Sequence, residues 1–173
     1  MLESSEKLNN QAIILAQQGE FKEAIACFKR AISIERQNYL LWFNLGVTYR
    51  DAGKLEDARS AMEKAAEINP DDEGVLESLA ALCFSMGDND EAMYWCTLCL
   101  EENIYNSHIW NTIGVLYFNQ RDYGSACEAF EHAITIDPYY YDALYNLRDT
   151  YEEMGNPMGM AECDKRMKDL EPK

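Results

Sequence analysis

Apolar and small residues recur along the chain at the spacing of amphipathic helices. In the segment that starts at Glu73, a first set with intervals of three and four residues consists of Leu76, Leu79, Ala80 and Cys83. A second set follows with similar intervals and consists of Ala92, Cys96 and Cys99. Such intervals place side chains on one face of an α-helix. The segment therefore predicts two consecutive helices, each with one buried face.

The same pattern returns every 34 residues. Five units follow one another without a gap, and they begin at Ser5, Tyr39, Glu73, Ser107 and Tyr141. Trp42 and Trp110 hold the same place in units two and four, which predicts that both fill a core position. Two helices repeated over units this short indicate a stack in which each unit packs on its neighbours.

Turn residues separate the predicted helices. A glycine stands between the two helices of four units, at Gly19, Gly53, Gly87 and Gly155. This placement suits a turn that needs a positive φ. Pro70 and Pro138 end the second helix of units two and four. Because no segment has the pattern of a β-strand, the predicted fold is all-α.

This combination of aromatic, small and proline positions resembles the tetratricopeptide repeat. In unit two the motif reads Trp42-Phe43-Asn44-Leu45-Gly46, and it continues with Tyr49, Ala58, Ala65 and Pro70. The resemblance implies a right-handed α-solenoid of antiparallel helix pairs, the tetratricopeptide superhelix. It also implies a single domain over residues 1–173, with repeats at 5–38, 39–72, 73–106, 107–140 and 141–173.

The last unit departs from the pattern. Arg148 stands where the other units have alanine or glycine, and Met160 and Asp164 replace residues that suit packing. A stack needs a polar outer face at its end, so we expect repeat 141–173 to act as a C-terminal cap. The first helix of unit one lacks such cover, which leaves self-association through the repeat ends open.

The chain is strongly acidic, with a formal net charge of −16. No lysine or arginine lies between Lys64 and Arg121. Such a charge repels nucleic acid and anionic membranes, and it speeds encounter with a basic partner. The alternative is that the acidity serves only solubility.

Cys96 and Cys99 form a CxxC motif, which is typical of redox and zinc sites. A zinc site needs two further ligands, and the chain has no second CxxC motif and only two histidines, His108 and His132. The two cysteines also occupy helix positions that packing requires. We therefore expect reduced thiols, no metal and no cofactor. His132 is expected to be a solvated residue on the surface of a second helix.

The sequence does not predict an enzyme. It contains no Ser-His-Asp constellation, no glycine-rich phosphate loop and no dedicated pair of carboxylates. It also contains no run of about 18 apolar residues that would span a membrane. Residues 1–10 are polar rather than typical of a signal peptide, so a cytoplasmic location is expected.

In the family that the chain resembles, the first helix of each repeat lines a concave groove. The resemblance places these residues in the groove: Asn10, Ile13, Leu40, Phe43, Asn44, Val47, Arg50, Ser78, Phe84, His108, Asn111, Thr112, Phe118, Tyr145, Asn146 and Asp149. Five short polar side chains form a ladder, at Asn10, Asn44, Ser78, Thr112 and Asn146. The ladder either bonds the backbone of an extended peptide or bonds within the stack. Large apolar side chains beside it are typical of a binding site.

The groove predicts a module that binds a peptide segment of a partner protein, as an adaptor, scaffold or chaperone-like protein. Its acidic end suits a partner with basic residues beside apolar anchors, and it comprises Asp142, Asp149, Glu152 and Glu153. One branch of the family clamps the C-terminal carboxylate of chaperones with lysine, arginine and asparagine. Only Asn44 matches that clamp in the first three repeats, so a carboxylate clamp is not expected. The alternative is a structural scaffold that self-associates through its repeat ends.

Overall fold

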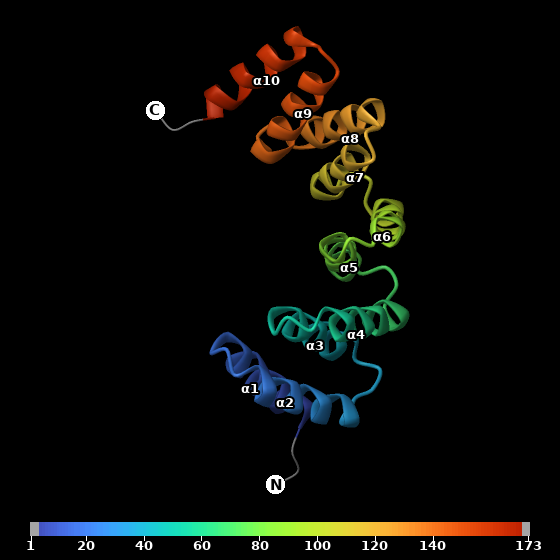
Figure 1. Ribbon diagram of the computed structural model, residues 1–173. Coiled ribbons are helices and arrows are strands. Elements are labelled where there is room, and N and C mark those ends of the chain that lie inside the picture. The colour runs from blue at the N-terminus through green and yellow to red at the C-terminus, as the bar shows by residue number, and fades with distance from the viewer. Residues whose placement is uncertain (1–3, 171–173) are drawn as a thin grey trace. The chain divides into compact units, whose positions relative to one another are not determined.

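A computed structural model describes residues 4–170 of the protein. In this range the chain forms ten α-helices and no strand (Figure 1). The helices are α1 (Ser5–Gln17), α2 (Phe21–Ile34), α3 (Tyr39–Asp51), α4 (Leu55–Ile68), α5 (Glu73–Met86), α6 (Asn89–Glu102), α7 (Ser107–Asn119), α8 (Tyr123–Ile136), α9 (Tyr141–Glu153) and α10 (Pro157–Leu170).

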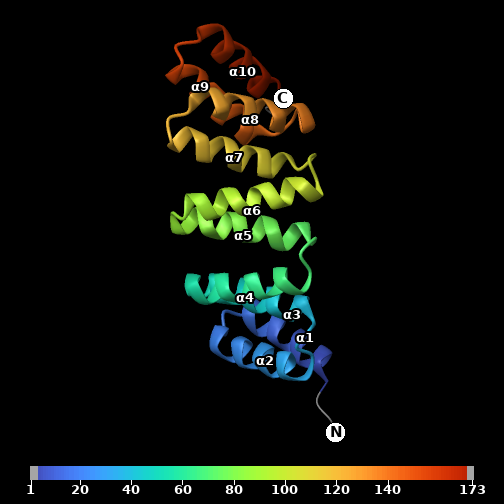
Figure 2. The ribbon, with the colours of Figure 1, turned by 90° about the vertical axis from the view of Figure 1, so that its right-hand side faces the viewer.

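The helices form two compact units, Met1–Ala92 and Met93–Lys173, and the division between them lies within α6. In the first unit α1 packs on α2, α3 packs on α4, and α2 contacts α3. In the second unit α7 packs on α8, α9 packs on α10, and α8 contacts α9 (Figure 2). The first helices of neighbouring pairs also touch, α1 with α3 and α7 with α9. The expected all-α fold of packed helix pairs is confirmed.

In two helix pairs a glycine of the first helix faces a large side chain of the second helix at close range. A Cβ atom added at Gly114 of α7 would lie 2.5 Å from the Phe130 ring of α8. A Cβ atom added at Gly46 of α3 would lie 2.6 Å from the Met62 side chain of α4. The large side chain of the second helix therefore occupies the space that the missing side chain of the first helix leaves.

The last pair replaces this apolar contact with an ion pair. Arg148 of α9 stands at the position of Gly114, and Asp164 of α10 stands at the position of Phe130. The Arg148 Nε donates to Asp164 Oδ1 at 3.3 Å. The two departures of this repeat from the pattern, Arg148 and Asp164, are therefore one polar contact. Both side chains remain partly exposed, which suits a surface ion pair rather than a core.

Trp42 and Trp110 are not core residues, which corrects the expectation from their matching positions. Each is half-buried, whereas Leu8, Leu76 and Leu144 at the same repeat position are buried. The Trp42 indole N–H donates to the carbonyl oxygen of Arg36 at 2.9 Å, and the Trp110 indole N–H donates to that of Ile104 at 2.8 Å. An indole is too large for a space that leucine fills, and its polar edge bonds the preceding loop instead.

Four glycines adopt the positive φ that their position between helices predicts, with φ of 80° at Gly19, 73° at Gly53, 84° at Gly87 and 65° at Gly155. In the fourth repeat the equivalent residue is Arg121, whose φ is 61°. A residue with a Cβ atom is disfavoured in this left-handed conformation by about 1–2 kcal/mol. The turn between α7 and α8 is therefore strained in a way that the other turns are not.

Replacing Arg121 with glycine is expected to raise the free energy of unfolding by about 0.5–1 kcal/mol, because relief of the strain exceeds the added chain entropy of the unfolded state. As a matched control, Gly53→Ala introduces the same backbone strain, because Gly53 has a φ of 73°. No atom lies within 4 Å of the added Cβ, so a steric clash does not contribute. The substitution should lower the free energy of unfolding by about 1 kcal/mol. Urea unfolding measures both, and a destabilised Arg121→Gly variant would contradict this account.

Candidate functional site

The predicted groove residues lie on the first helices, and none of them is fully buried. In the first unit, α1, α3 and α5 carry the half-buried or exposed residues Asn10, Ile13, Leu40, Phe43, Asn44, Val47, Arg50, Ser78 and Phe84. In the second unit, α7 and α9 carry His108, Asn111, Thr112, Phe118, Tyr145, Asn146 and Asp149. Leu40 and Tyr145 are each 50% exposed, which is unusual for large apolar side chains. We call these residues the first-helix face.

Two of the five ladder residues, Asn44 and Asn146, bond a neighbouring repeat, which is one of the two readings of the ladder. The Asn44 amide N–H donates to Asn9 Oδ1 at 3.1 Å, so α3 is joined to α1. The Asn146 amide N–H donates to Asn111 Oδ1 at 3.0 Å, so α9 is joined to α7. Each bond uses one of the two N–H donors of the amide. The asparagines therefore link neighbouring repeats and keep one further donor each.

A small cavity opens on the first-helix face of the second unit. It has a volume of about 70 Å³, and it is lined by Val115, Phe118, Phe130, Asn146 and Asp149. Phe118 also contacts Tyr123 edge to face, with ring centroids 5.4 Å apart, which holds its ring in place. Three predicted groove residues, from α7 and α9, thus meet around one hollow that combines aromatic, amide and carboxylate groups.

Charged residues on the first-helix face are partly neutralised by neighbours. Arg148 donates to Asp149 at 3.0 Å and to Glu152 at 2.7 Å, so two carboxylates of the predicted acidic end share one guanidinium. These hydrogen bonds raise the pKa of Arg148, which stays charged. In the first unit Arg50 bonds Asp51 at 2.9 Å. Counting Asp164 as well, one cation faces three carboxylates, so the acidic end keeps a net negative charge.

His108 is tied to the next repeat rather than free on the face. Its Nδ1 lies 3.0 Å from the Tyr140 hydroxyl. The two rings also meet edge to face, with centroids 4.8 Å apart. A ligand that reaches His108 therefore meets an imidazole whose orientation is fixed.

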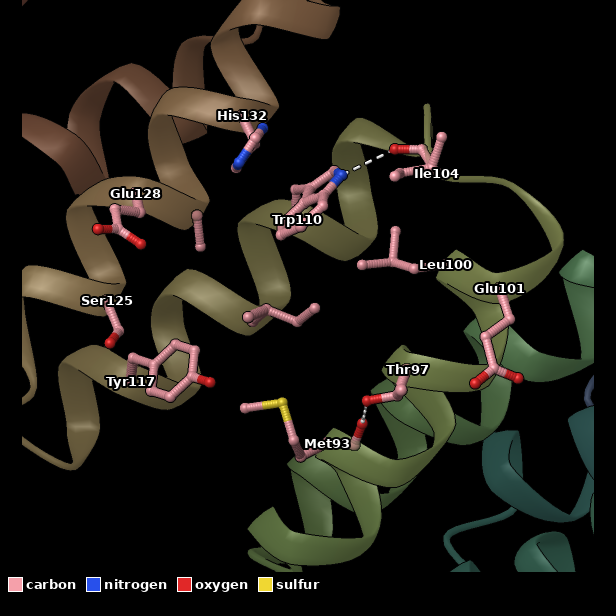
Figure 3. Close-up of a pocket in the computed structure, with 12 residues that line it drawn as sticks. Met93, Thr97, Leu100, Glu101, Ile104, Trp110, Tyr117, Ser125, Glu128 and His132 are labelled. Atoms are coloured by element: carbon pink, nitrogen blue, oxygen red, sulfur yellow. Dashed lines mark hydrogen bonds between the residues drawn. The ribbon is translucent and has the colours of Figure 1, made fainter.

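A larger hollow lies elsewhere in the second unit, among α6, α7 and α8, and the groove pattern of the sequence does not predict it. It has a volume of about 480 Å³, and we call it the α6–α8 pocket (Figure 3). Its lining consists of Met93, Thr97, Leu100, Glu101, Ile104, Trp110, Ile113, Tyr117, Ser125, Glu128, Ala129 and His132. Three of them, Trp110, Ile113 and Tyr117, belong to α7. Because successive residues of a helix are rotated by about 100°, these three lie on the side of α7 opposite to its residues of the first-helix face.

His132 is exposed on α8, as the sequence predicts, and it also lines this pocket. Its ring is exposed, but it stacks on Trp110 with centroids 4.4 Å apart and an angle of 24° between the planes. Figure 3 shows the two rings together, with the indole nitrogen directed to Ile104. The sequence contains a signal for this stacking. The residue equivalent to His132 two repeats earlier is Lys64, and an imidazole ring stacks on the neighbouring tryptophan better than a lysine does.

The six cysteines are buried and none of them forms a disulfide: Cys27, Cys83, Cys96, Cys99, Cys127 and Cys163. Burial raises the pKa of the Cys83 and Cys163 thiols to about 11, so both are protonated at neutral pH. Among residues 4–170, no group of three or more histidine, cysteine, aspartate or glutamate residues is placed to hold a metal ion. No helix of the described part is both long and apolar enough to cross a membrane.

Sequence profiles described as tetratricopeptide repeat match residues 15–81, 49–96 and 107–140. The chain belongs to the tetratricopeptide repeat family. Among curated proteins it resembles the BBSome complex member BBS4 of Bos taurus, with 24% identity over 75% of this chain and 25% of that protein. It also resembles the TPR repeat-containing protein MJ1428 of Methanocaldococcus jannaschii, with 24% identity over 82% of this chain and 27% of that protein. The chain therefore spans about a quarter of these relatives.

Solved structures of tetratricopeptide repeat (TPR) proteins share the fold. The crystal structure of MamA is 20% identical and covers 98% of this chain and 93% of its own, with a TM-score of 0.88. YrrB, described as a TPR protein with an unusual peptide-binding site, is 20% identical and covers 96% of this chain and 86% of its own, with a TM-score of 0.77. The expected α-solenoid of helix pairs is thereby confirmed. Repeats of this family serve in general as protein–protein interaction modules.

Proposed function

We propose that the protein binds a peptide segment of a partner protein along its first-helix face, without catalysing a reaction. The observation that carries this proposal is the cavity between α7 and α9, where Phe118, Asn146 and Asp149 converge. A hollow of about 70 Å³ has room for a small apolar group rather than a whole ligand. It therefore suits an anchoring side chain of a longer segment.

The residues around the cavity indicate how such a segment would be held. Phe118 and the exposed Tyr145 offer aromatic surface to an apolar anchor. The second N–H of Asn146 is available to a backbone carbonyl of the segment. An extended chain advances about 3.3 Å per residue, and neighbouring helices lie about 10 Å apart. Each repeat should therefore meet about three residues of the ligand.

A basic partner is favoured over one held by its C-terminal carboxylate. Near Asp149, one guanidinium faces three carboxylates, so a lysine or arginine next to the anchor gains an attractive field. The clamp positions of the first three repeats carry Asn9, Ile13, Asn44, Gly74 and Ser78, which supply no cation for a carboxylate. The name of one relative, the peroxisomal targeting signal receptor of Candida albicans, supports recognition of a protein segment in this family.

We further propose that the repeats act as one domain and that repeat 141–173 closes it as a cap. The polar Arg148–Asp164 contact, which takes the place of an apolar one, supports this role. Light scattering of the purified chain tests the cap together with the alternative of a self-assembling scaffold. A monomer is expected, and concentration-dependent assembly would favour the scaffold.

The binding proposal is tested with a library of random 12-residue peptides displayed on phage and selected on the wild-type protein. A selected peptide is expected to bind Phe118→Ala and Tyr145→Ala at least about tenfold more weakly, mainly through a faster off-rate. The double variant Glu152→Lys/Glu153→Lys should mainly slow association and flatten its salt dependence.

Lys22→Ala serves as the control, because Lys22 is exposed on α2 and lies outside the first-helix face. Circular dichroism verifies that each variant keeps its helices. If both aromatic variants bind the selected peptide like the wild type, recognition does not use this face and the proposal is wrong.

A further inference from the structure

We infer that the α6–α8 pocket is a second binding site, which takes the side chain of a lysine or arginine from a basic segment of another protein. The pocket has an apolar floor formed by side chains such as Leu100, Trp110 and Ile113. Glu128 of α8 and Glu101 of α6 lie on opposite sides of it (Figure 3). No lysine or arginine is among its lining residues.

The floor of the pocket is rigid. Trp110 is fixed on one side by the stacked ring of His132 and at its edge by the hydrogen bond to Ile104. The Thr97 hydroxyl is held by its own helix, since it donates to the Met93 carbonyl oxygen at 2.9 Å. A volume of about 480 Å³ falls within the range of small-ligand sites, about 300–1,000 Å³. The hollow is thus large enough for a long side chain.

The equivalent place two repeats earlier indicates what is missing. There the apolar floor is nearly the same, with Trp42, Leu45, Tyr49 and Ala61 in place of Trp110, Ile113, Tyr117 and Ala129. The chain supplies its own cations to this floor, since the Lys29 Nζ lies 5.8 Å and the Lys54 Nζ 5.9 Å from the centre of the Tyr49 ring. Both distances are within the range of cation–π contacts.

In the α6–α8 pocket these cations are gone. Lys29, Arg36, Lys54 and Lys64 correspond, 68 residues later, to Thr97, Ile104, Asp122 and His132. Two serines of the earlier place, Ser33 and Ser60, correspond to Glu101 and Glu128. Among the residues that line the pocket, the one change in the opposite sense replaces Asp57 with Ser125; outside the lining, Gly53 corresponds to Arg121. The apolar floor is thus nearly the same in both places, whereas the residues around it change from basic to acidic. A cationic side chain of another protein can therefore occupy the position equivalent to the one that Lys29 and Lys54 occupy over Tyr49.

The next pocket along the chain also contains its own cation. It has a volume of about 370 Å³, and its lining includes Tyr151, Glu131, Glu162 and Arg166. Glu131 accepts a hydrogen bond from the Tyr151 hydroxyl at 2.7 Å, and Arg166 provides the positive charge. Of these three equivalent places in the described residues, the α6–α8 pocket is the one without a lysine or arginine of the chain.

A lysine or arginine fits this environment in two ways. Its aliphatic stem can lie along Leu100 and Ile113, as long cationic side chains do on apolar surfaces. Its charged group can then pair with Glu101 or Glu128 and face the aromatic rings of the floor. An acidic ligand would be repelled by the carboxylates, and a purely apolar one would gain no attraction from them.

The test uses a defined probe, the peptide acetyl-Gly-Ala-Leu-Arg-Ala-Gly-amide, with a matched peptide that carries neutral citrulline in place of the arginine. Nuclear magnetic resonance follows the backbone amide signals and the indole N–H signals of the tryptophans during titration. The arginine peptide should shift the Trp110 signal and bind at least about fivefold more tightly than the citrulline peptide. Equal affinities, or shifts confined to residues around Phe118, would overturn the inference.

Two variants separate the pocket from the overall charge. Thr97→Lys/His132→Lys restores the lysines found two repeats earlier and should abolish binding of the probe. Glu101→Lys/Glu128→Lys should weaken it at least tenfold. Glu20→Lys/Glu23→Lys changes the net charge by the same amount on exposed positions of the first unit and should change the affinity less than twofold. An equal loss in this control would mean that binding is nonspecific.

The experiments distinguish failure of this inference from failure of the proposed peptide binding on the first-helix face. Phe118→Ala should leave binding of the arginine probe unchanged, because Phe118 lies outside the α6–α8 pocket. If the pocket variants leave the probe's affinity unchanged but abolish concentration-dependent self-association, the occupant is a second copy of this chain. That outcome would overturn the assignment to another protein.

Discussion

Replacing Phe130 with alanine is expected to lower the free energy of unfolding by about 3–5 kcal/mol, the cost of emptying a well-packed aromatic site. Phe130 is 1% exposed and belongs to the core of the second unit. Half-buried side chains such as Trp110, Val115 and Phe118 pack against this core. Gly114, on the facing helix, has no side chain that could move into the cavity. Urea unfolding of the purified variant measures the loss.

Trp110→Ala is the comparison, and it should lower the free energy of unfolding by only about 1–2 kcal/mol because the indole is half-buried. Hydrogen exchange adds a spatial test. Contacts between helix pairs are local, so Phe130→Ala should reduce protection in α7 to α10 and spare α1 to α4. A uniform loss of protection over all helices would contradict a modular stack.

Gly114→Ala is expected to have the next largest effect, a loss of about 1–3 kcal/mol from overpacking. The added Cβ would lie 2.5–2.8 Å from three atoms of the Phe130 ring. A rigid ring in a closed core can move away only by displacing its own neighbours, so the backbones of α7 and α8 must separate. Urea unfolding measures the change.

Gly46→Ala is the matched substitution in the first unit. Its Cβ would lie 2.6 Å from Met62 Cγ, the one atom within 3.0 Å, and 3.2 and 3.3 Å from two backbone atoms of α4, Ala58 O and Met62 N. The unbranched Met62 side chain can change its rotamer more readily than a ring can move. We expect a smaller loss there than at Gly114. The double variant Gly114→Ala/Phe130→Leu should lose less than the sum of its single changes. Additive losses would show that the two positions do not share one space.

Much of the fold could be predicted because each position of the repeat can be compared across five units of the sequence. The apolar intervals and the glycines define helix pairs, and α3 and α7 begin at Tyr39 and Ser107, where the pattern starts a unit. The turn glycines adopt the predicted positive φ. These features depend on local periodicity and on the steric freedom of glycine, which a sequence carries directly.

The contacts of individual polar groups could not be predicted in the same way. The polar ladder had two readings, and only the structure shows that Asn44 and Asn146 each bond an asparagine of the preceding repeat. Arg148 and Asp164 are 16 residues apart and looked like two separate departures from the pattern. Their pairing depends on how two helices face each other, which periodicity does not specify.

By itself, the sequence determined the all-α class, the helix pairs, the turns and the acidic charge, because each follows from residue types at a fixed period. Only the tertiary structure decided that Trp42 and Trp110 lie at the surface of the helix pairs and bond the preceding loops. It also decided that α6, α7 and α8 enclose a pocket with an acidic rim. The physical reason is that exposure and cavities depend on side-chain volumes from several helices at once, and residues far apart in the chain share one surface only after the helices pack.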